Sequence, residues 1–272
     1  MHTVDTQSLG NTRDAPGIGG DAADLSSIAK TLNESLTTCD PIARLRGLRD
    51  AVAGRLVFTT SFGLEDQVVT HVLHQSGIDA EVVTLDTGRL FPETYDVWAR
   101  TELRYGRKIA PFYPNHSAVE ALVARQGING FYNSVEARQA CCRVRKVEPL
   151  ERALSGAAGW ITGLRADQSQ QRGSVTLAEA DDTRQLLKFN PLFDWTRDRA
   201  LDLAKSANIP LNPLHAAGFA SIGCAPCTRA LETGEPERAG RWWWENEAKK
   251  ECGLHLDHPA RTNAAAEATG SR

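Results

Sequence analysis

Four cysteines of this chain stand in two close pairs that suit metal chemistry. Cys141 and Cys142 are adjacent, and Cys224 and Cys227 form a C-x-x-C pair later in the chain. Such pairs of thiolates can ligate a zinc ion or an iron–sulfur cluster. Adjacent cysteines suit a bulky cluster better than zinc, whose ligands usually stand a few residues apart. A redox pair or buried apolar cysteines are the alternatives.

Basic residues accompany these thiols. Arg143, Arg145 and Lys146 directly follow the first pair, which argues against a purely apolar environment. A further cysteine, Cys252, follows two lysines, whose charges lower the pKa of a thiol and make it a better nucleophile. An ordinary surface cysteine on a tail is the alternative. The three tryptophans at 242–244 require apolar cover, so we expect that stretch to lie on the body of the protein.

Two glycine-containing loops could bind a nucleotide. Residues 61–66 read SFGLED and residues 85–94 read LDTGRLFPET, each after a predicted strand. Backbone amides at a strand-to-helix turn can hold an anion, and loops of neighbouring strands share one crevice. The first loop lacks the lysine of a Walker loop and the glycine spacing of a dinucleotide fingerprint. An ordinary turn remains the alternative for each loop.

Four arginines are candidates for contacts to phosphate or sulfate oxygens. They are Arg165, Arg172, Arg238 and Arg241. A guanidinium group binds such oxygens in a bidentate manner. Any one of these arginines alone is more often a solvated surface residue. Cys39 and the histidines show no spacing that indicates a site, so we assign them no role.

The elements that must position these residues alternate between strands and helices. Apolar, β-branched runs predict strands at 56–59, 81–86, 108–113, 159–164 and 186–192. Helical periodicity predicts helices after residue 63 and at 92–106, 135–154 and 196–207. Such alternation indicates a mainly parallel α/β sheet with right-handed crossovers. Ligands then collect at the carboxyl ends of the strands, in the loops after residues 60, 86 and 163.

The composition is that of an ordinary globular chain. Its 272 residues suffice for one large α/β domain or two small ones. A net charge of -3 provides no basic field for nonspecific nucleic-acid binding. No apolar run reaches the roughly 18 residues of a membrane helix, and the first 24 residues lack a signal-peptide pattern. We therefore expect a cytoplasmic protein whose cysteines are thiols, metal ligands or catalytic groups.

Seven motifs, taken in order, resemble the assimilatory sulfonucleotide reductases. They are SFGLED, LDTG, CCRVRKVEPL, TGLRADQS, KFNPL, SIGCAPCTR and GRWWWENEAKKECGLH, and the resemblance spans residues 57–255. It is closest to the thioredoxin-dependent adenosine 5'-phosphosulfate (APS) reductases that contain a 4Fe-4S cluster. The resemblance implies a single domain similar to the ATP pyrophosphatases, or adenine nucleotide alpha hydrolases, with helices on both faces of a parallel sheet. In the pyrophosphatase pattern S-G-G-x-D-S, Asp66 replaces a hydroxyl, which disfavours ATP cleavage.

The resemblance also implies a division of the chain. Residues 25–235 form the domain that binds nucleotide and cluster, and residues 236–260 form a mobile C-terminal catalytic segment. Residues 1–24 and 261–272 are expected to be disordered tails, because they lack periodic apolar residues.

The resemblance assigns the chemistry to the cysteines. It implies that Cys141, Cys142, Cys224 and Cys227 ligate the 4Fe-4S cluster and that Cys252 is the nucleophile. In such enzymes the thiolate attacks the sulfur of APS, expels AMP and forms an S-sulfocysteine. Thioredoxin then attacks this adduct and releases sulfite.

The remaining implied roles concern the substrate. The predicted contacts are Ser61, Gly63, Leu85, Asp86, Gly88, Lys146, Arg165, Arg172, Arg238 and Arg241. The cluster is expected to keep one oxidation state and to act electrostatically, with Lys146 between it and the substrate. A dimer or tetramer is implied by the family, and neither nucleic acid nor membrane is an expected partner.

Three other functions compete with this prediction. A reductase of the 3'-phosphorylated nucleotide (PAPS), or a dual APS/PAPS enzyme, is the nearest, although PAPS reductases typically lack the two cysteine pairs. A tRNA sulfur-transfer enzyme on the same fold would use the cysteines for zinc or persulfide, and the absence of a basic excess counts against it. A cluster-based redox sensor would need neither Cys252 nor the nucleotide loops.

Overall fold

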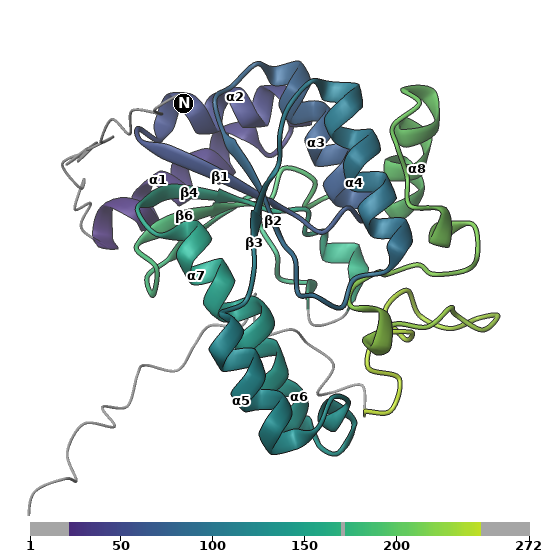
Figure 1. Ribbon diagram of the computed structural model, residues 1–272. Coiled ribbons are helices and arrows are strands. Elements are labelled where there is room, and N and C mark those ends of the chain that lie inside the picture. Colours follow the sequence, from purple (N-terminus) through teal and green to yellow (C-terminus); the bar gives the residue numbers. More distant parts are fainter. Residues whose placement is uncertain (1–21, 170–171, 246–272) are drawn as a thin grey trace, which may run out of the picture.

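The structure, a computed structural model, describes residues 22–169 and 172–245 (Figure 1). Within them, one sheet has the strand order β3-β2-β1-β4-β6-β5. The strands that run parallel are β1 (Arg55–Thr60), β2 (Glu81–Leu85), β3 (Ala110–Phe112), β4 (Ala157–Ile161) and β6 (Leu186–Phe189). Strand β5 (Ala178–Asp181) pairs antiparallel with β6 at one edge. This is the expected α/β architecture with one antiparallel strand added.

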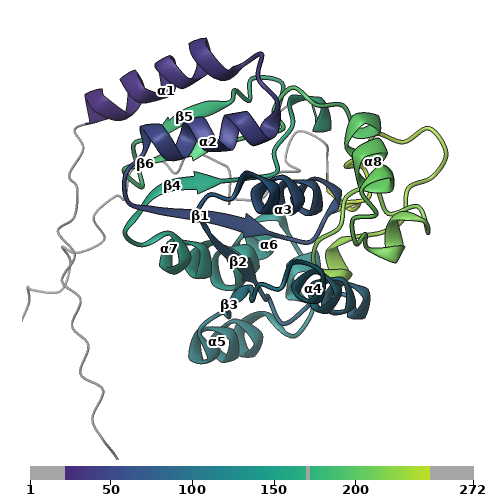
Figure 2. The same cartoon turned by 90° about the horizontal axis from the view of Figure 1, so that it is seen from above.

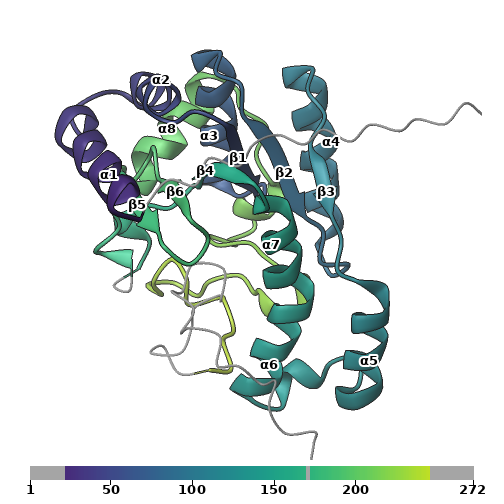
Figure 3. The ribbon, with the colours of Figure 1, turned by 90° about the vertical axis from the view of Figure 1, so that its left-hand side faces the viewer.

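Helices cover both faces of this sheet, as Figures 2 and 3 show. One face carries α1 (Ala22–Leu36), α2 (Pro41–Ala51), α3 (Leu64–Ser76), α4 (Pro92–Tyr105) and α8 (Arg197–Ser206). The other face carries α7 (Glu148–Leu154), which continues α6 (Val135–Cys142) as one rod beside α5 (His116–Gln126). Shorter helical turns are η1 (Gly130–Tyr132), η2 (Arg143–Val147), η3 (Ala166–Gln168), η5 (Pro213–His215) and η6 (Ala225–Cys227).

The strands supply two separate cores because successive side chains point to opposite faces. In β1, Leu56 and Phe58 join the core under α2 and α3, whereas Val57 joins the core under α7. Strand β4 does the same with Ile161 and Trp160. A sheet buried on both faces needs near-continuous apolar strands, and such apolar runs predict these strands from the sequence.

The helix predicted at 135–154 is confirmed, but it is not uniform. Its middle, η2, is a π-helical turn between α6 and α7. Strand β5 was not predicted, because its sequence AEAD lacks the β-branched residues of a strand and is stabilised by pairing with β6. Helix α1 begins at Ala22, inside the tail predicted to reach residue 24.

Several predictions fall beyond this part of the chain. The rest of the first tail, the last tail, and residues 246–260 of the C-terminal segment lie outside the described residues. Among the helices that are described, none combines the length and apolar character needed to cross a bilayer.

Candidate active site

The carboxyl ends of β1, β2 and β4 border a cavity of about 190 Å³. Its walls combine the loops after these strands with residues from 220–224 and 237–242. Seven of the predicted substrate contacts line it, namely Ser61, Gly63, Leu85, Lys146, Arg172, Arg238 and Arg241. The other three, Asp86, Gly88 and Arg165, are not part of its described lining. Parallel topology therefore brings widely separated segments around one space, as expected at this edge of an α/β sheet.

Asp66 closes the loop after β1. Its Oδ2 accepts hydrogen bonds from the Ser61 backbone N–H (2.6 Å) and from the Ser61 hydroxyl (2.7 Å). These bonds help to hold the turn, in which Phe62 has a φ of 61°, an unfavourable value for a bulky residue. A Cβ on Gly163 would lie 2.3 Å from Asp66 Oδ1, so this packing requires glycine. Burial raises the pKa of Asp66 to about 6, and the Ser61 amide is engaged with this carboxyl group.

Asp86 shapes the loop after β2. Its Oδ1 accepts hydrogen bonds from the Gly88 N–H and from the Tyr95 hydroxyl, both at 2.9 Å. Gly88 has a φ of 69°, which favours glycine at this turn. Thr87, which follows Asp86 in this loop, contacts the second cysteine pair, since its Oγ1 lies 3.2 Å from Cys224 Sγ. The loop after β2 therefore joins the cavity to the second cysteine pair.

Arg241 brings a buried positive charge into the cavity wall. The residue is 6% exposed, and its Nε has no hydrogen-bond partner among the residues that the structure describes. Its guanidinium lies on the backbone of Gly223, where an added Cβ would come within 2.3 Å of Nη2. It also lies 4.8 Å from the centre of the Trp242 ring. Leaving a buried donor unpaired costs about 1–3 kcal/mol, so the position suits an anionic ligand that supplies an acceptor.

The four predicted cluster ligands meet at a second, small cavity of about 20 Å³. Cys141, Cys142, Cys224 and Cys227 all line it. Phe131 and Trp242 pack beside the C-x-x-C pair and form an apolar wall. The fold therefore brings together two cysteine pairs that are far apart in sequence.

The first pair and Lys146 depend on the π-helical turn. Cys141 and Cys142 end α6, and Lys146 belongs to the η2 turn that follows at once. Turns of this kind insert a residue into a helix and occur frequently at functional sites. Lys146 lines both the cavity at the strand ends and the cysteine cavity, as do Cys224 and Trp242. The two cavities are therefore neighbours that share a cationic side chain.

The second pair is held by contacts to distant segments. The Ala225 N–H donates to the carbonyl of Arg89 at 2.8 Å, and the Tyr132 hydroxyl donates to the carbonyl of Pro226 at 2.5 Å. The C-x-x-C turn, η6, is thus tied to the loop after β2 and to η1.

The donor set fits a cysteine-ligated cluster in type and charge. Arg138 and Arg145 form hydrogen bonds with the side chains of Cys142 and Cys141, and cations stabilise thiolate ligands. Burial raises the pKa of Cys227 to about 12. Within residues 22–169 and 172–245, no group of three or more His, Cys, Asp or Glu side chains is arranged to hold a metal ion. The cluster therefore stays a prediction.

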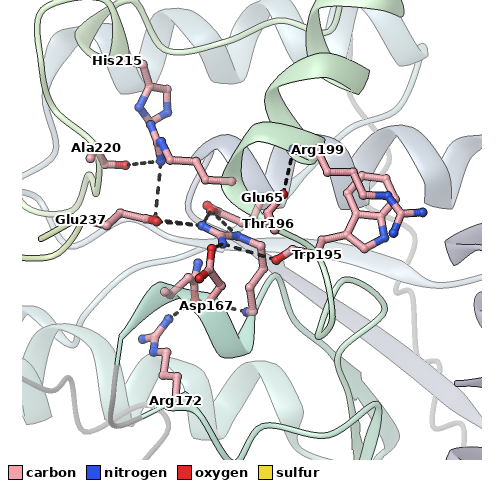
Figure 4. A network of polar contacts seen from close by, with 12 residues as sticks. Glu65, Asp167, Arg172, Trp195, Thr196, Arg199, His215, Ala220 and Glu237 are labelled. Carbon is pink, nitrogen blue, oxygen red and sulfur yellow. Dashed lines mark hydrogen bonds and ion pairs between the residues drawn. The ribbon is translucent and has the colours of Figure 1, made fainter.

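Arg165 is fully buried in a network of carboxylates. Its Nε and Nη2 donate to Glu65 Oε1 at 2.9 and 2.7 Å. Nη2 also contacts both carboxylate oxygens of Glu237, at 3.0 and 2.9 Å. Nη1 contacts Asp167 at 3.3 Å and the carbonyl of Trp195 at 3.4 Å. Figure 4 shows Glu65, Asp167 and Glu237 converging on one point.

Sequence reasoning missed several residues that shape the site. Glu65 lies in the SFGLED motif and Glu237 directly precedes Arg238, but their charge alone gave no sign that both pair with the buried Arg165. Gly163 and Gly223 make room for the side chains of Asp66 and Arg241, and only the packing reveals this. The predicted nucleophile, Cys252, lies outside the described residues.

Comparisons with known proteins point in one direction. Residues 55–230 match the phosphoadenosine phosphosulfate reductase domain family. An adenosine 5'-phosphosulfate reductase of Sinorhizobium fredii (strain NBRC 101917 / NGR234) is 53% identical over 236 residues, covering 87% of this chain and 94% of that protein. One of Rhizobium meliloti (strain 1021) is 53% identical over 228 residues, covering 84% and 86%. One of Allochromatium vinosum is 50% identical over 200 residues, covering 74% and 78%.

A solved structure supports the fold. The phosphoadenylyl-sulfate (PAPS) reductase of Candida auris, in a phosphate complex, matches with a TM-score of 0.64 at 24% identity. The match covers 74% of this chain and 96% of that one. The predicted α/β architecture is therefore confirmed by a known protein as well as by the strand order.

Proposed function

Because the chain belongs to the phosphoadenosine phosphosulfate reductase family, we propose that it reduces APS to sulfite and AMP. Relatives at 50–53% identity that are named adenosine 5'-phosphosulfate reductase support this choice of substrate. The observation that carries the proposal is the Nε of Arg241, which has no hydrogen-bond partner among the described residues and lies in a cavity that adjoins four cysteines through Lys146. This arrangement suits an anion held next to thiol chemistry.

The substrate would lie across the carboxyl ends of the strands. The nucleoside would contact the loops at Ser61, Gly63 and Leu85, which line the cavity. Its phosphate and sulfate groups would face the cations of the same cavity, which are Lys146, Arg172, Arg238 and Arg241. Charge-assisted hydrogen bonds from guanidinium groups are the strongest contacts available to such oxygens.

Cys141, Cys142, Cys224 and Cys227 would hold a 4Fe-4S cluster. When bound, the cluster supplies a fixed electrostatic field beside the substrate. Lys146, which borders both cavities, would orient the sulfate group toward the attacking thiolate. Arg138 and Arg145 would offset the negative charge of the thiolate ligands.

Cys252 would carry the covalent step. Its thiolate attacks the sulfur of APS, the bond between that sulfur and the bridging oxygen breaks, and AMP leaves with the electron pair. A thiolate of thioredoxin then attacks Sγ of the S-sulfocysteine and releases sulfite, and its second thiol resolves the mixed disulfide. The described cysteines are free thiols, which suits a reducing compartment such as the cytoplasm.

Asp66 favours APS over PAPS in this proposal. The carboxyl group closes the loop after β1 and has Glu65 as a neighbour, so an additional dianionic phosphate near this loop would meet negative charge. Replacement of Asp66 by serine should therefore raise the ratio of PAPS to APS turnover. An unchanged ratio would remove Asp66 as the source of the preference.

The decisive experiment is an anaerobic purification followed by two assays. Iron and acid-labile sulfide are measured, and sulfite release is followed with APS and PAPS in parallel, with thioredoxin as reductant. We expect four irons per chain and turnover that is selective for APS. Zinc in place of iron, with no sulfite from either nucleotide, would overturn the proposal and favour a tRNA sulfur-transfer enzyme.

Cysteine variants separate the two thiol roles. Cys252→Ser should keep its iron and lose sulfite release, whereas Cys141→Ala should lose iron and colour. Cys39→Ser is the matched control, since Cys39 is a partly exposed thiol in the turn after α1 and is not among the residues that line either cavity. Substantial sulfite release by Cys252→Ser would contradict the covalent mechanism.

A further inference from the structure

We infer that Arg165 is a positioning residue that acts through Glu237 and makes no contact with the substrate. Through that carboxylate it fixes the turn at residues 236–241, from which Arg238 and Arg241 reach the cavity. The inference rests on the proposed function, because it takes these two arginines as the contacts for the substrate's anionic groups.

Every N–H donor of Arg165 is directed at a protein group. A guanidinium group has five N–H bonds. Those of Arg165 are directed at Glu65 from Nε, at Glu65 and Glu237 from Nη2, and at Asp167 and the Trp195 carbonyl from Nη1. With 0% of its surface exposed, Arg165 keeps no donor for a ligand. Its guanidinium is therefore committed to protein groups.

Glu237 lies in the turn that carries two arginines of the cavity. It directly precedes Arg238, which lines the cavity. The backbone around it is a tight turn, in which Ala239 N–H donates to the Pro236 carbonyl and Arg241 N–H to the Arg238 carbonyl, both at 2.9 Å. The ion pair between the buried Arg165 and Glu237 therefore fixes the backbone from which both arginines project.

The other end of this turn is tied to the cysteine region. Thr228 and Arg241 form an antiparallel bridge, and the Trp242 N–H donates to the Cys227 carbonyl at 3.2 Å. The turn is thus held by backbone pairing on the cysteine side and by ion pairs on the side of Arg165. Arg197 also contributes to the ion pairs of Glu237, but more weakly, because its Nη1 lies 3.5 Å from Glu237 Oε1.

Arg165 also binds a second residue of the cavity lining, Glu65. Glu65, its second carboxylate partner, lies beside Asp66 in the first turn of α3, directly after the loop that follows β1. One guanidinium thereby links two walls that are far apart in sequence. A change that releases Glu237 should weaken the contacts made by Arg238 and Arg241 and leave the nucleoside contacts at the strand ends intact.

The experiment compares two ligands that differ by one phosphate, AMP and adenosine. Their affinities are measured by calorimetry on the anaerobically purified holoprotein for the wild type and for Glu237→Gln. We expect Glu237→Gln to weaken AMP binding about tenfold, as for the loss of one well-placed charged contact. Adenosine binding should change less than about twofold, because adenosine does not need the two arginines. Equal losses for both ligands would overturn the inference.

A double-mutant cycle tests whether Arg165 acts through Glu237. Arg165→Lys keeps the charge but loses the fork geometry, so it should also weaken AMP binding. The double variant Arg165→Lys/Glu237→Gln should bind AMP no more weakly than the worse single variant. Additive losses would mean that Arg165 contacts the ligand itself, and would overturn the inference. If Arg165→Lys fails to fold, the ratio of AMP to adenosine affinity in Glu237→Gln decides alone.

Glu235→Gln is the matched control in the same segment. Glu235 pairs with Arg229 near the surface and should leave both affinities unchanged. Loss of AMP binding in this control to the same extent as in Glu237→Gln would overturn the specific role of Glu237. A wild type that binds AMP no better than adenosine would overturn the inference together with its premise. A wild type that prefers AMP but releases no sulfite would contradict the proposed function alone.

Discussion

Arg165 and Arg241 are both buried arginines near the same cavity, and they differ in what surrounds the charge. Arg165 is 0% exposed and contacts three carboxylates, whereas Arg241 is 6% exposed and keeps an Nε without a hydrogen-bond partner in the described part of the chain. From the sequence, both were predicted as substrate contacts. Burial alone therefore does not distinguish an arginine that holds the protein together from one that binds a ligand.

The two roles are distinguished by whether the N–H donors of the buried guanidinium already have protein acceptors. A buried charge whose donors are all satisfied contributes to structure, and removing it exposes the desolvation penalty of its partners. A buried charge with an unsatisfied donor already carries that penalty in the free protein, and a ligand can relieve it. The two arginines should therefore respond in opposite ways to substitution.

The largest loss of stability is expected on replacement of Arg165, whose N–H donors all contact protein groups. Arg165→Met leaves the buried Glu65 and the largely covered Glu237 without their common cation, and we expect a loss of about 3–5 kcal/mol in the free energy of unfolding. Urea unfolding of the two proteins measures it. Changing both glutamates to glutamine in the Arg165→Met background should recover part of the loss, because no buried carboxylate then lacks a partner. A loss below about 1 kcal/mol would break the comparison.

Asp66 provides an intermediate case, a partly exposed acid whose desolvation is only partly offset by its hydrogen bonds to Ser61. Its pKa is raised from 3.8 to about 6, mainly by burial, so the folded protein holds this proton more tightly than the unfolded chain. The resulting stability is fully present below about pH 4 and is lost as the pH rises through about 6. A shift of this size corresponds to about 3 kcal/mol.

Comparison with Asp66→Asn isolates this contribution. Between pH 4 and pH 7 the wild type should lose about 3 kcal/mol more stability than the variant, which has no titrating group at this position. Urea unfolding at several pH values gives both profiles. Parallel profiles would mean that the Asp66 carboxyl group is ionised throughout, with its pKa unshifted.

Substitution of Arg241 should affect ligand binding more than stability, in contrast to substitutions of Arg165 and Asp66. Arg241→Gln is expected to weaken AMP binding about 10- to 100-fold, the effect of losing one or two hydrogen bonds to a charged group. Its free energy of unfolding should stay within about 1 kcal/mol of the wild type, since the variant removes a donor that has no partner in the described structure. Calorimetry measures the affinity for AMP, and urea unfolding measures the free energy of unfolding. A large loss of stability with unchanged AMP affinity would make Arg241 a second structural arginine.

These contrasts also mark what the sequence could predict. The α/β fold follows from local patterns, since runs such as 56–59 are apolar and β-branched and are separated by helical periodicity. The position of the cavity follows as well, because parallel strands bring their carboxyl ends to one edge. Strand β5 did not follow, because its pairing with β6 is a tertiary interaction.

In the site, too, the sequence predicts which motifs come together but does not predict the tertiary contacts of single side chains. Motifs placed the cysteine pairs and the arginines in candidate positions, and the structure brings the four cysteines and three of the four arginines to adjoining cavities. Which arginine faces a carboxylate depends on contacts between positions far apart in the chain, such as Arg165 with Glu237. Local sequence contains no signal for such pairs, so the assignment of donors requires the three-dimensional structure.

The smallest expected effect concerns an ion pair that is not buried. The Arg229 and Glu235 side chains are 31% and 26% exposed and lie 2.6 Å apart, a closer approach than that of Arg165 to either glutamate. If distance determined the strength of a pair, Glu235→Gln would be as harmful as the loss of Arg165. Solvent screens the exposed pair, so we expect a change of only about 0.2–1 kcal/mol, measured by urea unfolding. A loss of several kcal/mol would show that geometry outweighs burial, and the contrast between Arg165 and Arg241 would then need another cause.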